Sequence, residues 1–313
     1  SSSGQFCPLL ARPMILLRPS VFSGPCRRAS GARRLAMAAG PAAPLEREPL
    51  PWERAVADFR SLLDAGALLH GSRATGLAGA GSDVDLLASV PLRALAEQLL
   101  RLAAEEGADG SPFQLLEDVH WAKVPRLILR HSATGTELDL ISASSDSSAP
   151  ERDDVVRLLV EREPLALQLA LRIGDWAREH RAVLVPAQGF PNTYTLRLTG
   201  FHWLMVRPGG PLLPALGEEG AAFCREPSPR RRGGCGGEVC AEDLFEEWLD
   251  RVSGAEEAGL WADLRRPWEA GGGWRVVDPV SGRNLTPFRG SQPGVLAALA
   301  RGGGGGHGRR RLA

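Results

Sequence analysis

Two aspartates separated by one residue stand at the start of an apolar run. Asp83 and Asp85 flank Val84 and are followed by Leu86 and Leu87, which is strand-like sequence. Alternate residues of a strand point to the same face of its sheet. Two carboxylates on one face repel each other unless a cation lies between them. The spacing therefore predicts a site for a divalent metal ion.

A glycine–serine pair precedes the aspartates. Gly71 and Ser72 follow the apolar run that ends at His70, where a strand is expected to give way to a helix. Backbone N–H groups at such a position are available to an anion such as a phosphate. A metal site beside a phosphate cradle is the arrangement that nucleotidyl transfer needs.

Such a site usually takes a third carboxylate from a neighbouring strand. Asp139, in Glu137-Leu138-Asp139-Leu140-Ile141, lies between apolar residues and is the favoured candidate. Glu137 points to the same face of the expected strand and is its rival.

The elements that position these residues form an α/β unit with a small, mixed, twisted sheet. Apolar residues at helical or alternating spacing predict the elements. Helices are expected over 52–65 and 92–106, and strands over 83–90, 124–131, 137–142 and in a segment ending at 70. Residues 142–150 are expected to be a polar linker.

The second unit is expected to be helical. Its helices are expected over 163–181, 194–206 and 241–252, with a short strand over 274–279. The predicted domains are 46–150 and 151–290, with a loop insertion over 217–240 and a flexible Gly/Arg tail over 291–313.

The charge is unevenly placed along the chain. Residues 1–45 hold six arginines and no acid, which is typical of an organelle transit peptide or a disordered leader. Because acidic and basic side chains number 37 each, a nucleic acid would have to bind local basic patches. No apolar run is long enough to cross a membrane. We expect an intracellular protein, in the cytoplasm, or in a mitochondrion or plastid if residues 1–45 are a transit peptide.

The odd number of cysteines argues against a disulfide framework. They are Cys7, Cys26, Cys224, Cys235 and Cys240, and a reducing compartment is the default for such a set. The last three could bind zinc, but the Cys-x2-Cys spacing is missing. Free thiols in a Gly/Arg-rich loop are therefore favoured.

An ordered set of motifs extends these observations over residues 52–290. It comprises Gly71-Ser72, Thr75–Ala78, Ser82–Leu86, Ala122–Leu127, Trp176–Arg178, Pro191–Leu196, Pro211–Leu216 and Val277–Pro279 with Asn284. In this order the chain resembles the poly(A) polymerase and terminal uridylyltransferase family of the polymerase-β-like nucleotidyltransferases.

The resemblance implies an α/β nucleotidyltransferase domain with a small mixed sheet, followed by a mainly α-helical PAP-associated-type domain. It implies that Asp83, Asp85 and Asp139 bind two Mg²⁺ or Mn²⁺ ions, with Asp139 best placed to activate an attacking RNA 3′-hydroxyl. The implied nucleotide-binding residues are Gly71, Ser72, Arg178, Thr193, Tyr194 and Asn284. Among them, Gly71 and Ser72 hold the triphosphate of an NTP, Arg178 contacts a phosphate, and Tyr194 stacks on the base.

The chain departs from the family pattern at several positions. Gly174 stands where the family has a lysine, two residues before the tryptophan, and Arg152, Asp153 and Asp154 lie where an Asn-Thr pair is expected. Arg283 precedes Asn284, where uridylyl-selective relatives often have a histidine. This last difference favours ATP over UTP.

Three functions follow from these patterns. The first is template-independent addition of AMP or UMP to an RNA 3′ end. The second is a catalytically weak or inactive RNA-binding module, motivated by Gly174 and the missing Asn-Thr pair. The third keeps the chemistry but transfers the nucleotide to a non-RNA acceptor.

Overall fold

The computed structural model describes residues 47–79, 81–106, 110–122, 125–217, 239–269, 274–286 and 292–303. The predicted leader, Lys123, Val124, most of the predicted loop insertion and the residues after 303 lie outside these ranges. Of the cysteines, Cys240 is described, and its thiol is free and exposed. Residues 49–313 form one compact unit, separate from residues 1–48.

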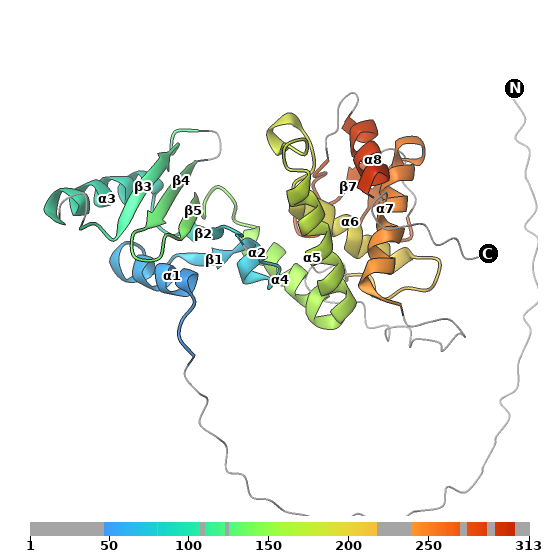
Figure 1. Ribbon diagram of the computed structural model, residues 1–313, viewed down its shortest axis with the longest axis horizontal. Coiled ribbons are helices and arrows are strands. Elements are labelled where there is room, and N and C mark those ends of the chain that lie inside the picture. Colours follow the sequence, from blue (N-terminus) through green and yellow to red (C-terminus); the bar gives the residue numbers. More distant parts are fainter. Residues whose placement is uncertain are drawn as a thin grey trace, which may run out of the picture. The chain divides into compact units, whose positions relative to one another are not determined.

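The first part of this unit is a five-stranded mixed sheet in the order β1-β2-β5-β4-β3 (Figure 1). The strands are β1 (Leu68–His70), β2 (Val84–Ala88), β3 (Phe113–Asp118), β4 (Arg126–His131) and β5 (Glu137–Ser142). Strands β2 and β5 are parallel, and the other neighbouring pairs are antiparallel. The small mixed sheet predicted from the sequence is confirmed.

One face of this sheet is apolar because alternate strand residues point into a core. Leu86, Leu138, Leu140, Leu127 and Leu129 are fully buried there. Helices α1 (Pro51–Leu62) and α3 (Leu92–Glu106) cover this face, with Phe59 of α1 and Leu95 of α3 in the same core. The opposite face therefore remains for the polar residues that alternate with the leucines.

The second part is mainly helical and has its own core. It contains α4 (Ala149–Arg162), α5 (Pro164–Glu179), η1 (Pro186–Gln188), α6 (Thr193–Val206), α7 (Ala241–Ala258) and α8 (Gln292–Gly303). A small parallel pair, β6 (Trp261–Ala262) and β7 (Arg275–Val276), completes it. None of the described helices is both long and apolar enough to span a membrane.

Helix α6 is central to this core. Leu198, Phe201, Leu204 and Met205 of α6 are almost completely buried, whereas its first turn carries polar side chains. Asn192 caps the N-terminus, because its Oδ1 accepts from the Thr195 N–H (2.9 Å). Capping fixes where the helix begins, and so fixes the positions of Thr193 and Tyr194.

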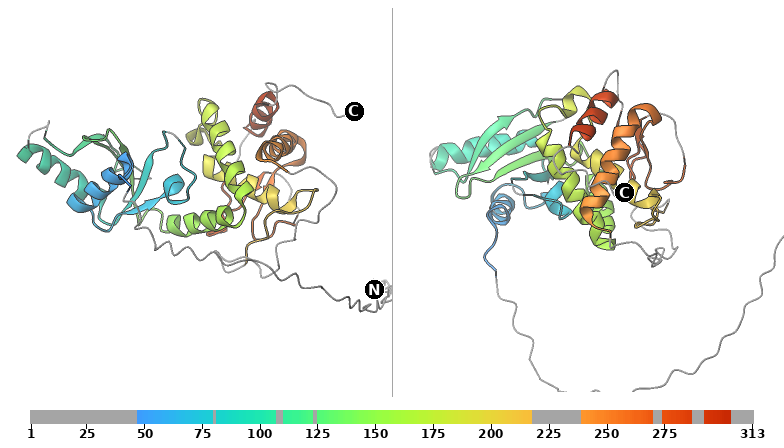
Figure 2. Two further views of the ribbon diagram at one scale, coloured as in Figure 1. Left: turned by 60° about the horizontal axis from the view of Figure 1, so that its bottom comes forward. Right: turned by 45° about the vertical axis from the view of Figure 1, so that its right-hand side comes forward.

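The prediction of a flexible tail over 291–313 was wrong for residues 292–303. These residues form α8, which lies beside α7 in Figures 1 and 2. Leu296, Ala297 and Ala300 are buried, because they recur at helical spacing and present one apolar stripe. Arg301 donates to the Ser253 carbonyl of α7 (3.2 Å).

Strand β3 and helix α4 are among the elements that were not predicted. Buried and exposed side chains do not alternate regularly along strand β3. Its register with β4 shifts between Leu115 and Glu117. Helix α4 begins inside the predicted polar linker, where Pro150 occupies its first turn. Proline suits that position because its missing N–H has no partner there in any case.

The buried histidine of α6 predicts a loss of stability in acid. His202 Nε2 donates to the Pro267 carbonyl and Nδ1 accepts from Arg251, both at 3.1 Å. Burial, together with the charge of Arg251, lowers the pKa of His202 to about 4. The unfolded chain therefore takes up this proton first as the pH falls below about 6.5, and the free energy of unfolding decreases by up to about 3 kcal/mol by pH 4.

Urea unfolding of the wild type and His202→Gln at pH 7.5 and pH 4.5 checks this expectation. The wild type should lose more stability than the variant between the two pH values. Equal losses in the two proteins would show that His202 is not the group responsible.

Candidate active site

Two aspartates lie next to each other on the polar face of the sheet. Asp85 of β2 is opposite Asp139 of β5 in the parallel register, and Asp83 directly precedes β2. Burial raises the pKa of Asp85 to about 6, and the negative charges of Asp139, Asp83 and Asp153 add to this effect. The strand pairing thus brings together the carboxylates that the sequence placed far apart.

Asp139 is incompletely satisfied by protein partners. Its Oδ1 is buried without a hydrogen-bond partner among the described residues. Its Oδ2 lies 3.7 Å from Nη1 of Arg126, whose Nη2 donates to Glu117 (2.9 Å). Burial raises the pKa of Asp139, partly offset by Arg126. Its rival Glu137 is exposed and accepts from Arg130 (2.6 Å), so Asp139 is the better ligand candidate.

The carboxylates fit a hard divalent cation by their chemistry. As the side chains stand, no three histidine, cysteine, aspartate or glutamate residues in the described ranges converge closely enough to hold a metal ion. Nevertheless, repelling carboxylates and an unpartnered oxygen are what a cation would relieve. Oxygen donors of this kind suit Mg²⁺ or Mn²⁺.

Gly71 lies against this acidic group. It begins α2 (Gly71–Ala74) directly after β1, with a φ of 70°. A Cβ atom at this position would lie 2.5 Å from Oδ2 of Asp85, so any other residue would displace this carboxylate. Its N–H donates to Oδ2 of Asp153 (2.9 Å). The N–H therefore binds an oxygen anion, as predicted for a phosphate, but here the anion is a side chain of α4.

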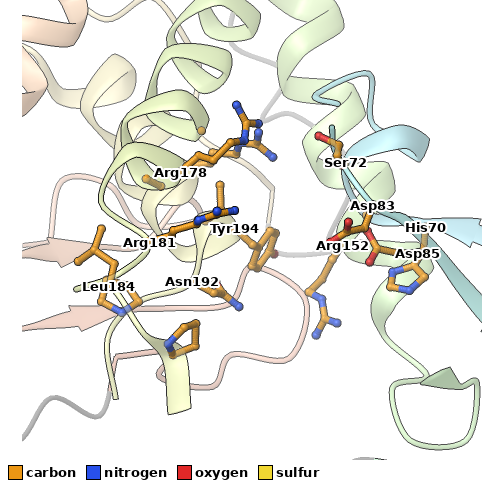
Figure 3. Close-up of a pocket in the computed structure, with 18 of the residues that line it drawn as sticks. His70, Ser72, Asp83, Asp85, Arg152, Arg178, Arg181, Leu184, Asn192 and Tyr194 are labelled. Carbon is orange, nitrogen blue, oxygen red and sulfur yellow. The ribbon is translucent and has the colours of Figure 1, made fainter. Parts of the chain in front are cut away.

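A cavity of about 880 Å³ opens beside these residues, a size typical of small-molecule sites. Its charged lining residues divide into two groups of opposite sign. The acidic ones are Asp83, Asp85, Asp146 and Asp153, and the basic ones are Arg152, Arg178, Arg181 and Arg197. Figure 3 shows Ser72, Asp83 and Asp85 facing the cavity from the sheet-containing part, and Arg178, Arg181 and Tyr194 from the helical part.

Tyr194, the only tyrosine of the chain, lies in the wall of this cavity. Its hydroxyl is buried without a hydrogen-bond partner among the described residues, and burial raises the pKa of this group. The Arg152 guanidinium lies 5.8 Å from the ring centroid. Arg152 also pairs with Asp146, and its Nη1 is 3.6 Å from Asp278.

Most of the residues proposed from the sequence line one cavity, and two do not. Those that line it are Gly71, Ser72, Asp83, Asp85, Arg178, Thr193 and Tyr194. Asp139 lies beside Asp85 on the neighbouring strand β5 but is not part of the cavity lining. Asn284 is exposed, and its Oδ1 accepts from the N–H and hydroxyl of Thr286 (3.1 and 3.2 Å). Its neighbour Leu285 reaches the cavity instead.

Several polar lining residues were not proposed as site residues from the sequence. Among them are His70, Asn192, Arg181 and Arg197. Burial lowers the pKa of His70 to about 4, so this side chain is neutral at pH 7. The sequence does contain a signal for Arg197. In the mostly apolar stretch 193–206 it is the single residue of the types Arg, Lys, Asp and Glu.

Comparison with known proteins identifies the sheet-containing part. Residues 53–140 match the family model of the nucleotidyltransferase domain. The chain contains a nucleotidyltransferase domain. The matched segment includes Gly71, Ser72, Asp83, Asp85 and Asp139, and so contains two of the four aspartates that line the cavity. No curated protein sequence matches the chain.

Solved structures show the fold of the helical part as well. The chain is similar to mtPAP in complex with ATPγS, with a TM-score of 0.61 and 14% identity, and to mtPAP in complex with UTP, with 0.60 and 16%. Each match covers 79% of this chain, and 61% and 60% of the mtPAP chain, so this chain spans about three fifths of that length. A Cid1 poly(U) polymerase structure matches with a TM-score of 0.59 and 16% identity, over 80% of this chain and 86% of that one.

The nucleotidyltransferase domain and the helical region together thus have the fold of poly(A) and poly(U) polymerases. The resemblance stated from the sequence motifs is confirmed at this level. The described residues of this compact unit have two hydrophobic cores, and the domain bounds 46–150 and 151–290 stay a prediction.

Proposed function

We propose that the protein is a template-independent RNA nucleotidyltransferase, which adds AMP or UMP from an NTP to an RNA 3′-hydroxyl. The observation that carries this proposal is the cavity with Asp83 and Asp85 on its sheet side and Arg178, Arg181 and Arg197 on its helical side. A metal-bound triphosphate needs both: oxygen ligands for the cation and guanidinium groups for the phosphates. The mtPAP structures with ATPγS and UTP support a nucleotide as the occupant.

In this proposal Asp83, Asp85 and Asp139 hold two Mg²⁺ or Mn²⁺ ions. Bound there, the ions would activate the attacking 3′-hydroxyl and neutralise the leaving pyrophosphate. The Gly71 N–H and Ser72 bind the triphosphate once Asp153 has moved away from Gly71. Arg178, held by Asp175 at 2.8 Å, presents its charge to a phosphate. Thr193 supplies a hydroxyl at the start of α6.

The proposed nucleotide and acceptor follow from the family resemblance and the fold. Arg283 beside Asn284 favours ATP over UTP through the family resemblance, although neither residue lines the cavity. An RNA 3′ end is the proposed acceptor because the fold is that of poly(A) and poly(U) polymerases.

Primer extension with each of the four NTPs tests the choice directly. The full chain is incubated with a labelled RNA and Mg²⁺ or Mn²⁺, and an RNA with a 2′,3′-dideoxy end serves as the control. We expect ATP to be added fastest and the blocked RNA not to be extended. RNA binding without extension by any NTP would instead indicate an inactive binding module, and transfer only to another acceptor would exclude RNA as the substrate.

Substitution of Tyr194 separates base stacking from the polar role of its hydroxyl. Loss of an aromatic platform for a base costs about 1–3 kcal/mol, so Tyr194→Ala should raise the KM for the NTP about 5- to 150-fold. Tyr194→Phe should behave like the wild type, because the hydroxyl has no partner among the described residues. Steady-state kinetics of both variants measure this, and equal defects in both would disprove the stacking role.

A further inference from the structure

Arg197 of α6 is a buried cation without an acidic partner. Only 9% of the residue is exposed. Its Nε donates to the Ala170 carbonyl (3.1 Å) and its Nη2 to the Leu77 carbonyl (3.0 Å). Within the described ranges it forms no ion pair, and its Nη1 makes no hydrogen bond. Burying an uncompensated charge is costly, so this position needs an explanation.

The neighbouring helix leaves space for this guanidinium. Gly174 lies in the middle of α5, where glycine is about 1 kcal/mol less favourable than alanine. A Cβ atom on Gly174 would lie 2.5 Å from Nη2 of Arg197. Any side chain at position 174 would therefore displace the guanidinium from its present place.

The surroundings of Arg197 are positively charged. Burial lowers the pKa of Arg197 to about 10, and the charge of Arg178 acts in the same direction. The charge of Asp175 opposes these effects, but Asp175 is hydrogen-bonded to Arg178 at 2.8 Å. Arg178, Arg181 and Arg197 line the same cavity. This arrangement is complementary to a ligand with several negative charges.

We propose that Arg197 is a triphosphate-binding residue and that Gly174 is required to seat it. This inference rests on the proposed function and adds a specific cation to it. The free Nη1 supplies donors to a phosphate oxygen, and a planar guanidinium suits phosphate geometry. Because Nη2 is anchored to Leu77, in the loop that follows Ser72, Arg197 also holds the Gly-Ser side of the cavity against α5.

If Arg197 only stabilised the fold, its loss would lower stability without a specific effect on phosphate binding. A second buried arginine provides the control for this alternative. Arg251 of α7 is also buried, donates to the Trp261 carbonyl (3.1 Å) and lies over the Trp203 ring, but it does not line the cavity. Arg197→Met and Arg251→Met each remove a buried guanidinium from the helical part. Both are expected to lower the melting temperature of the full-length protein.

Binding of inorganic tripolyphosphate and of adenosine, measured by calorimetry without metal, separates the two roles. Arg197→Met should weaken tripolyphosphate binding at least tenfold and change adenosine binding less than twofold, whereas Arg251→Met should change neither. If Arg197→Met leaves tripolyphosphate binding unchanged, or weakens both ligands equally, the inference is wrong. Such a failure differs from failure of the proposed function, because the wild type would still extend RNA.

Transferring the positive charge from position 197 of α6 to position 174 of α5 provides a second test. Gly174→Lys alone should weaken tripolyphosphate binding, because its side chain meets Arg197. Gly174→Lys combined with Arg197→Ala should restore binding to within a few-fold of the wild type, since the lysine takes the vacated space. A double variant no better than Arg197→Ala would overturn the pairing of Gly174 with Arg197.

Discussion

Asp85→Asn is expected to lower the rate of nucleotidyl transfer by about 10³-fold or more, with the protein still folded. Metal ions at such a site stabilise the transition state by several kcal/mol, and each 1.36 kcal/mol is a factor of ten in rate. The substituted amide would keep the shape of the side chain but lose its charge. Because the substitution also removes the repulsion from Asp83, Asp139 and Asp153, the metal-free variant should be at least as stable as the wild type.

The measurement combines transfer rates with thermal unfolding in the presence and absence of Mg²⁺. Mg²⁺ should raise the melting temperature of the wild type and leave that of Asp85→Asn unchanged. Glu137→Gln is the matched control, since this carboxylate lies in β5 but is exposed and paired with Arg130. It should retain activity within about twofold. Activity of Asp85→Asn comparable to that of the control would refute the assignment of Asp85 as a metal ligand.

Gly71→Ala is expected to lower activity by about 10²-fold. A Cβ atom there would lie 2.5 Å from Oδ2 of Asp85, so Asp85 has to move, and small displacements of catalytic groups can cost this much. The positive φ of Gly71 adds a conformational cost of about 1–2 kcal/mol. The same substitution also crowds the N–H that Asp153 now binds.

Gly135→Ala isolates the conformational part of this effect. Gly135, between β4 and β5, has a φ of 68°, close to the 70° of Gly71, but no atom lies within 4 Å of its Cβ position. It should lose stability by about 1 kcal/mol and keep its activity within twofold. If urea unfolding and transfer rates show Gly71→Ala to be no worse than Gly135→Ala, the close approach of Gly71 to Asp85 has no catalytic importance.

The acidic side of the site was largely predictable from the sequence. Leu86, Leu138 and Leu140 alternate with Asp85 and Asp139, so a buried face of leucines forces both aspartates to the other face. The Gly-Ser pair before them was identified for a different reason, because it directly follows an apolar strand. Helix α3 was predicted with the bounds that the structure gives it, Leu92–Glu106.

The basic side was harder to predict because it is made by tertiary contacts. Whether Arg197 points to solvent or into a cavity depends on Gly174 and Leu77, which belong to other elements. Asp153 was noted as a departure from the family pattern, but its hydrogen bond to Gly71 joins residues 82 positions apart. Asn284 was placed in the site by the family resemblance alone, and its local turn with Thr286 holds it outside the cavity.

The most direct test of the account is the stoichiometry of the reaction of the wild-type chain. An RNA with a free 3′-hydroxyl is incubated with ATP and Mg²⁺, and added nucleotides and released pyrophosphate are counted together. The account predicts one pyrophosphate per AMP added, only with metal and only with a free 3′-hydroxyl. Absence of addition with any NTP and either metal would contradict it.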